Sequence, residues 1–124
     1  MNWLLAGALA GGAGVVVGAF GAHALKARLT ADMLAVFETG VRYHMYHALA
    51  LMVVGWAATR GASAGLGAAG WGFLGGIVVF SGSLYVLALT GVRAWGAVTP
   101  LGGVAFIVGW LSLAWWALRG STGA

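Results

Sequence analysis

The sequence contains no cysteine and only one proline among its 124 residues, and it has few charged residues. Without cysteine the chain can form no disulfide framework, no thiolate metal site and no thiol nucleophile. Charged residues make up 6% of the chain, whereas about 25% is usual in a soluble domain. Hydrophobic residues make up 62%, and the mean hydropathy is +0.99. Because too little polar surface exists to cover a water-facing globule, the composition predicts an integral membrane protein.

The six basic residues outnumber the two acidic ones, but they are scattered singly along the chain. They form no basic patch, so we expect no nucleic-acid partner and take the lipid bilayer as the predicted surroundings. The N-terminus lacks the Lys or Arg that begins a secretory signal, and its apolar run is longer than a typical signal core. We therefore interpret that run as a membrane span.

The apolar stretches predict an all-α membrane protein, a bundle of four transmembrane helices that forms a single domain over residues 1–124. A helix of about twenty residues is about 30 Å long, which matches the core of a bilayer. The predicted spans cover about residues 3–22, 41–58, 68–90 and 100–118. The residues at the start of the fourth span favour helix initiation, because Thr99 can cap a helix and Pro100 fits its first position.

The segment between the first two spans is more polar and predicts a short amphipathic helix at the membrane interface. Thr30 is suited to cap this helix, and Asp32 would lie in its first turn. Gly40 would then allow a bend into the second span. One long helix over 31–58 is equally compatible with the sequence.

Glycines recur in the first span at a spacing of four and three residues, which places them on one face of a helix. Such a face lets a second helix approach closely, which is how membrane helices associate. We expect these seams to pack helices together, within the chain, with a second copy of it or with another membrane protein. The predicted packing glycines are Gly7, Gly11, Gly14, Gly18, Gly21, Gly72, Gly76, Gly102 and Gly109.

A four-span chain has both termini on one side, together with the 59–67 loop. Five tryptophans would then form an aromatic belt on that side: Trp3, Trp56, Trp71, Trp115 and Trp116. The opposite side has four basic residues against two on the terminal side. The positive-inside rule therefore predicts a cytoplasmic position for the other two loops and an external position for both termini of an inner-membrane protein.

The predicted topology gathers most polar side chains in the cytoplasmic half of the bundle. Polar groups within a bilayer usually face the bundle interior, so this half predicts a polar pocket. Its candidate residues are His23, Glu38, Arg42, Tyr43, His44, His47, Ser81, Ser83, Tyr85, Thr90 and Thr99.

Within this pocket, His44 and His47 lie one helical turn apart and have the spacing to share a metal ion. Glu38 lies on another face of the same helix and is poorly placed as a third ligand. We therefore favour hydrogen-bonded histidines, with no metal, haem or other cofactor. Glu38 and Arg42 have the order that suits an ion pair, and the alternative is that they serve as counter-charges for a solute or proton.

Four stretches of this chain resemble the YgdD/YwdK-type family of small membrane proteins, which occurs in bacteria and has mitochondrial relatives. They are GAFGAHAL at 18–25, FETGVRYHMYHAL at 37–49, FSGSLY at 80–85 and TPLGG at 99–103. The resemblance implies a four-helix inner-membrane protein and supplies no activity. His23, His47, Ser81, Ser83, Tyr85, Thr99 and Pro100 match the family pattern, whereas relatives often carry Gln at the position of His44.

No nucleophile–base pair or phosphate-binding loop can be read from the sequence, which disfavours an enzyme and leaves no catalytic residue to name. We expect a non-enzymatic scaffold or accessory protein. The alternative is a transporter or channel-like protein for a small solute or proton, and a metal or redox protein is a third class.

The predicted orientation can be tested with single cysteines, because the chain has none of its own. A cysteine at position 63 should react with a membrane-impermeant thiol reagent applied to intact cells. A cysteine at position 28 or 93 should react only after the cells are permeabilised. The reverse pattern would invert the bundle.

Overall fold

The computed structural model describes residues 1–122, with side chains described as far as Gly120. Within this range the chain forms helices and connecting turns, as the sequence predicts, and no strand. The α-helices are α1 (Trp3–Phe20), α2 (Ala31–Ala58), α3 (Ala64–Gly76), α4 (Gly82–Thr90) and α5 (Thr99–Thr122). Two π-helical turns, η1 (Gly21–Leu25) and η2 (Ile77–Ser81), and a 3₁₀-helix, η3 (Arg93–Ala97), complete the described elements.

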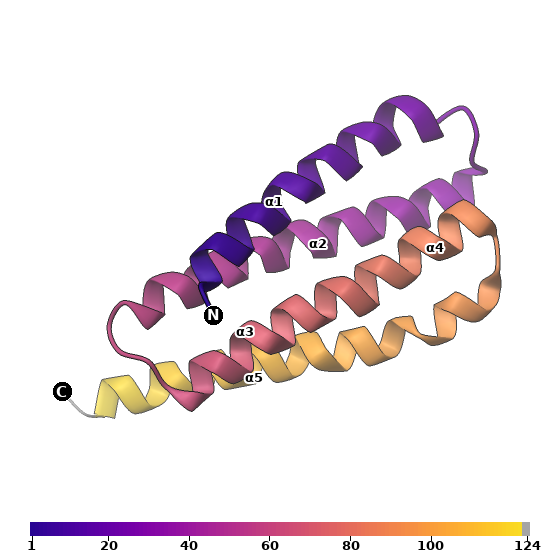
Figure 1. Cartoon of the computed structure of the whole chain (residues 1–124). Coiled ribbons are helices and arrows are strands. Elements are labelled where there is room, and N and C mark those ends of the chain that lie inside the picture. Colours follow the sequence, from indigo (N-terminus) through magenta and orange to yellow (C-terminus); the bar gives the residue numbers. More distant parts are fainter. Residues whose placement is uncertain (123–124) are drawn as a thin grey trace.

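The short elements extend the α-helices, so the described chain consists of four helical rods (Figure 1). η1 continues α1, and η2 joins α3 to α4 in one rod from Ala64 to Thr90. Figure 1 shows successive rods running in opposite directions, with the start of α1, the end of α5 and the α2–α3 connection at the same end. Three segments are long and apolar enough to cross a membrane by length and composition: Trp3–Leu25, Ala64–Thr90 and Arg93–Gly120.

α2 is a single helix, which settles the alternatives that the sequence left open for residues 31–58. Thr30 caps it as predicted, since its hydroxyl accepts a hydrogen bond from the Met33 backbone N–H. The helix continues through Gly40 without a break, and there is no separate interfacial helix among the described residues. Gly40 instead gives room to a neighbouring helix, because a Cβ there would lie 2.8 Å from the Tyr85 ring.

The N-terminal part of α2 packs into the bundle. Phe37 is buried with Leu25 and Ala88, and this small core is extended by Leu29, Val36 and Tyr85. The apolar side chains of the segment that predicted an interfacial helix therefore contact η1 and α4.

α2 occupies the centre of the bundle, where it contacts α1, α3, η2 and α4. α5 packs along α3 and η2 on the other side. The main core lies between these rods and includes Leu51, Val54, Phe73 and Phe106.

Trp3 also belongs to the main core, so its predicted place in an aromatic belt is wrong. Only 6% of its surface is exposed, and its ring lies against Gly70 and edge-on to Trp71 at 5.2 Å. Gly70 has no side chain to exclude the indole, which explains how this large ring enters the core. Trp56, Trp71 and Trp115 are exposed, and Trp116 is half-buried.

The five predicted packing glycines of the first rod all face α2. A Cβ on Gly7 would lie 2.8 Å from the Ala48 carbonyl oxygen, and a Cβ on Gly14 would clash with Met45 and lie 3.3 Å from His44. The other three, Gly11, Gly18 and Gly21, face Ala48, Val41 and Phe37. Since this seam is filled by the chain's own α2, a second protein could use it only if α1 separated from α2.

The remaining packing glycines lie between the third rod and α5. A Cβ on Gly72 would lie 2.8 Å from the Ala105 carbonyl oxygen, and one on Gly102 would meet the Phe80 backbone. Gly76 and Gly109 make room for the rings of Phe106 and Phe73. Both pairs of neighbouring rods are therefore held at backbone-contact distance by glycine.

Replacing Gly14 with Leu should destabilise the protein by about 1–3 kcal/mol, because the larger side chain overpacks the α1–α2 contact. Thermal unfolding in mild detergent would measure the loss. Gly12→Leu and Ala8→Leu are matched controls, since Gly12 has open space around it and Ala8 is exposed. Equal melting temperatures for the three variants would contradict the packing role of Gly14.

Candidate functional site

His44 connects three helices through its two ring nitrogens. Its Nε2 lies 2.8 Å from the Ala10 carbonyl oxygen on α1, and its Nδ1 lies 2.8 Å from the Tyr85 hydroxyl on α4. A carbonyl oxygen only accepts, so Nε2 carries a proton, and in the neutral ring Nδ1 is then the acceptor of a hydrogen bond from the Tyr85 hydroxyl. Gly14 makes this contact feasible, because it lies beside the imidazole and has no side chain to keep it from α1.

His47 lies one turn later on α2 and forms a hydrogen bond with α5. The roles of its two ring nitrogens are the reverse of those in His44. Its Nδ1–H donates to the Tyr43 carbonyl oxygen at 2.6 Å, and its Nε2 accepts from the Trp110 indole N–H at 3.0 Å. Phe106 stacks on the imidazole with ring centroids 3.5 Å apart. Because the indole can only donate, a proton on Nε2 would place two donors face to face. The contacts therefore select neutral His47 with its proton on Nδ1.

These contacts bear on the metal site considered for the two histidines. A metal ion needs an unprotonated ring nitrogen with a free lone pair, and in both rings each nitrogen already has a hydrogen-bond partner. Within the described residues, no group of three or more His, Asp or Glu side chains is placed to hold a metal ion. The arrangement suits helix association better than metal binding.

Two serines extend the polar contacts along the third rod. Ser81 is fully buried at the end of the π-helical turn η2, and its hydroxyl donates to the Gly40 carbonyl oxygen on α2 at 2.7 Å. Ser83 lies 2.6 Å from the Thr99 hydroxyl on α5 and also donates to the Phe80 carbonyl oxygen at 2.8 Å. Thr99 begins α5 as predicted, but its hydroxyl contacts Ser83 and the Trp95 carbonyl oxygen and makes no capping bond in the described chain.

The structure thus brings six of the predicted pocket residues together as links between helices: His44, His47, Ser81, Ser83, Tyr85 and Thr99. Across the described residues, every buried side-chain nitrogen or oxygen has a hydrogen-bond partner. This part of the interior is therefore a set of satisfied interhelical contacts.

The other predicted residues lie outside this network. His23 is exposed on η1, and the Thr90 hydroxyl donates to the Val86 carbonyl oxygen of its own helix. Tyr43 is 39% exposed, and its ring lies 4.7 Å from that of Phe80.

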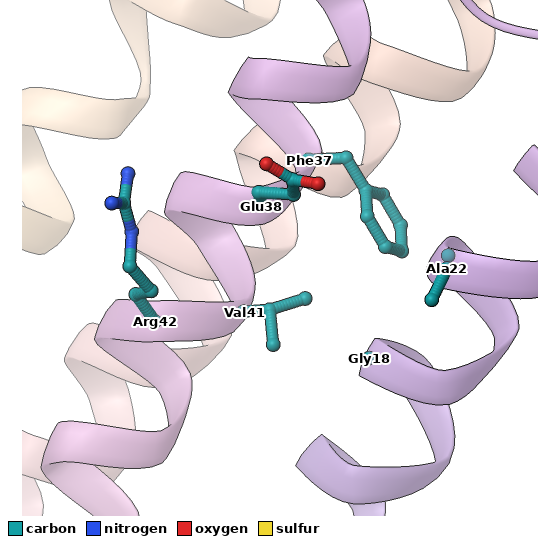
Figure 2. Close-up of a pocket in the computed structure, with 7 residues that line it drawn as sticks. Gly18, Ala22, Phe37, Glu38, Val41 and Arg42 are labelled. Atoms are coloured by element: carbon teal, nitrogen blue, oxygen red, sulfur yellow. The ribbon is translucent and has the colours of Figure 1, made fainter. Parts of the chain in front are cut away.

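Glu38 and Arg42 are exposed on α2, and the ion pair considered for them is not formed in the described chain. The Arg42 guanidinium instead donates to the Thr39 hydroxyl at 3.2 Å. In Figure 2, Phe37 and Val41 extend toward α1, whereas the charged groups of Glu38 and Arg42 lie apart from each other. These residues line a cleft of about 310 Å³ between α1 and α2, the α1–α2 cleft, with Gly18, Gly21 and Ala22 on its other wall.

A second hollow, about 480 Å³ in volume, lies between α2 and α5 and is mostly aromatic. Tyr46, Phe80, Phe106 and Trp110 line it beside His47. The sequence interpretation did not single out these four residues. The spacing of Phe106 and Trp110, four residues apart on one helix, is the signal that points to a shared face.

Comparisons with known proteins agree with the membrane fold. A family model described as "Protein of unknown function (DUF423)" matches residues 17–103. The chain is 47% identical to the UPF0382 membrane protein YwdK of Bacillus subtilis over 114 residues, which cover 90% of this chain and 91% of the relative. It is 49% identical to the UPF0382 membrane protein SSP2132 of Staphylococcus saprophyticus over 111 residues, which cover 90% and 92%. No solved structure shows a significant match.

The two histidines should show opposite neutral tautomers in ¹⁵N NMR spectra of histidine-labelled protein at neutral pH. His44 should carry its proton on Nε2 and His47 on Nδ1, because each faces a carbonyl oxygen with that nitrogen. Trp110→Phe should perturb the signals of His47 and leave those of His44 unchanged. Identical tautomers, or a fast mixture at both rings, would contradict the hydrogen-bond assignment.

Proposed function

This chain belongs to the DUF423 family, and we propose that it acts as a non-catalytic accessory or scaffold protein with four spans in the bacterial inner membrane. Its relatives named above are called membrane proteins, and its three most apolar rods have the length and composition of spans. The observation that carries the proposal is the interior network, in which buried polar side chains serve to join helices.

α2 is the fourth span in this proposal, although composition alone does not select it. Its polar side chains lower its hydropathy, but His44 and His47 are only 6% and 4% exposed. A polar side chain is tolerated within a bilayer when it faces the bundle and has a partner there. Each histidine meets that condition through contacts with other helices.

The distribution of basic residues supports external termini. Lys26, Arg28 and Arg93 lie in the connections at one end of the bundle, whereas Arg60, in the α2–α3 connection, and Arg119, near the end of α5, lie at the opposite end. Because cytoplasmic loops are richer in Lys and Arg, we expect the end of the bundle with Lys26, Arg28 and Arg93 to face the cytoplasm.

A scaffold fits this interior better than a transporter does. Glycine contacts bring α1 against α2 and α3 against α5, and the hydrogen bonds between rods occupy the interior polar groups. Transport remains the alternative because Glu38 and Arg42 form no ion pair with each other in the described chain and line a cleft.

Flux through proteoliposomes tests the choice between the two. We expect no proton flux above that of protein-free vesicles for the parent, Glu38→Gln, Arg42→Gln and the double variant. In thermal unfolding the double variant should be no more stable than either single variant, because in the described chain Arg42 contacts Thr39 and forms no ion pair with Glu38 that a single substitution would break. Flux in the parent that is lost in a stably folded double variant would overturn the scaffold proposal.

A further inference from the structure

We propose that the α1–α2 cleft binds the headgroup of an aminophospholipid, a phosphate ester that also carries a primary ammonium. Arg42 would hold the phosphate, and Glu38 would accept hydrogen bonds from the ammonium. The inference requires the chain to lie in a membrane, but it does not depend on the scaffold role.

The cleft is hollow because its two walls differ in side-chain size. The α1 wall consists of Gly18, Gly21 and Ala22, and the α2 wall carries Phe37 and Val41 as well as the two charged residues. The volume of about 310 Å³ lies at the lower end of the range of small-molecule sites, about 300–1,000 Å³. It suits a headgroup better than a large ligand.

Glu38 and Arg42 have opposite signs and both line the cleft. In Figure 2 the Arg42 guanidinium extends away from α1, so it would reach a ligand in the cleft by turning away from Thr39. Glu38 and Arg42 are four residues apart, which is about 6 Å along a helix. This spacing and order favour an ion pair, yet Arg42 contacts the neutral hydroxyl of Thr39. A ligand with one negative and one positive group satisfies both side chains, whereas a ligand with a single charge leaves one of them without a counter-charge.

The chemistry of each side chain indicates which group it binds. A guanidinium can donate two parallel hydrogen bonds to phosphate, the geometry that makes Arg suited to phosphate recognition. A carboxylate only accepts, and a primary ammonium offers three N–H donors to it. A trimethylated ammonium has no N–H, so Glu38 should distinguish ethanolamine from choline.

The surroundings of the cleft favour a lipid as the carrier of this headgroup. On α1, the apolar side chains of Val15, Val16 and Phe20 are exposed within two turns of the cleft. Such a surface accommodates acyl chains while the headgroup lies between the charges. Lys26 and Arg28 follow in the adjoining connection, and basic side chains at a membrane surface attract lipid phosphates.

Lipid retention in native mass spectrometry provides the test. The purified protein would be offered equal amounts of phosphatidylethanolamine, phosphatidylcholine and phosphatidylglycerol with identical acyl chains. We expect phosphatidylethanolamine to be retained about tenfold more strongly than either of the others, since only its headgroup offers ammonium N–H donors to Glu38 and tenfold corresponds to about 1.4 kcal/mol. Equal retention of the three lipids would overturn the proposal.

Three variants separate the roles of the cleft residues. Glu38→Gln should abolish the preference for phosphatidylethanolamine, and Arg42→Gln should weaken retention of all three lipids. Ala22→Leu should weaken all retention by filling the cleft, with both charges left in place. The two charged side chains are exposed, so their replacement should leave the melting temperature unchanged.

Asp32→Asn and Arg93→Gln are matched controls, because both side chains are exposed near the same end of the bundle and do not line the cleft. Both should retain lipids like the parent. A preference that persists in Glu38→Gln, or is lost equally in Asp32→Asn, would overturn the role of Glu38. Soluble phosphoethanolamine should bind at least tenfold more weakly than the lipid, and equal binding would overturn the lipid as the ligand's source.

Discussion

The close contact between α1 and α2 at Gly14 is the constraint on which much of the bundle depends. Without a side chain at this position, the imidazole of His44 reaches the Ala10 carbonyl oxygen and also contacts Tyr85. A backbone approach and a hydrogen bond thus stabilise the same junction of three helices. In a bilayer, where apolar burial does not drive helices together, these two kinds of contact are the main sources of association.

α2 illustrates how the position of a helix is decided by its partners. It has the most ionisable groups of any described helix, and it is also the helix with neighbours on most sides. Its buried polar groups are those that meet donors or acceptors on α1, η2, α4 and α5, whereas its charged groups are exposed. Glu38 and Arg42 line the α1–α2 cleft, which is why we propose that cleft as the site of an external ligand.

Much of the architecture could be predicted from the sequence because it depends on local patterns. The apolar stretches indicate the rods, Thr30 indicates the start of α2, and the spacing of the glycines indicates the face of α1 that packs. The family could also be recognised, since its motifs are contiguous stretches of sequence. The polar residues of the interior could be named, because polar side chains are rare in so apolar a chain.

By its composition, the sequence itself therefore determined two things: that the chain is a helical membrane protein, and which of its residues cannot face lipid. The tertiary structure alone decided the partners of those residues, since hydrogen bonds such as that of His47 with Trp110 join positions 63 residues apart. It also placed Trp3 in the core, where Gly70 of another rod makes room, and left Glu38 and Arg42 separate despite a favourable spacing. Helical periodicity gives the face on which a side chain lies, but the packing of whole helices decides which groups that face meets.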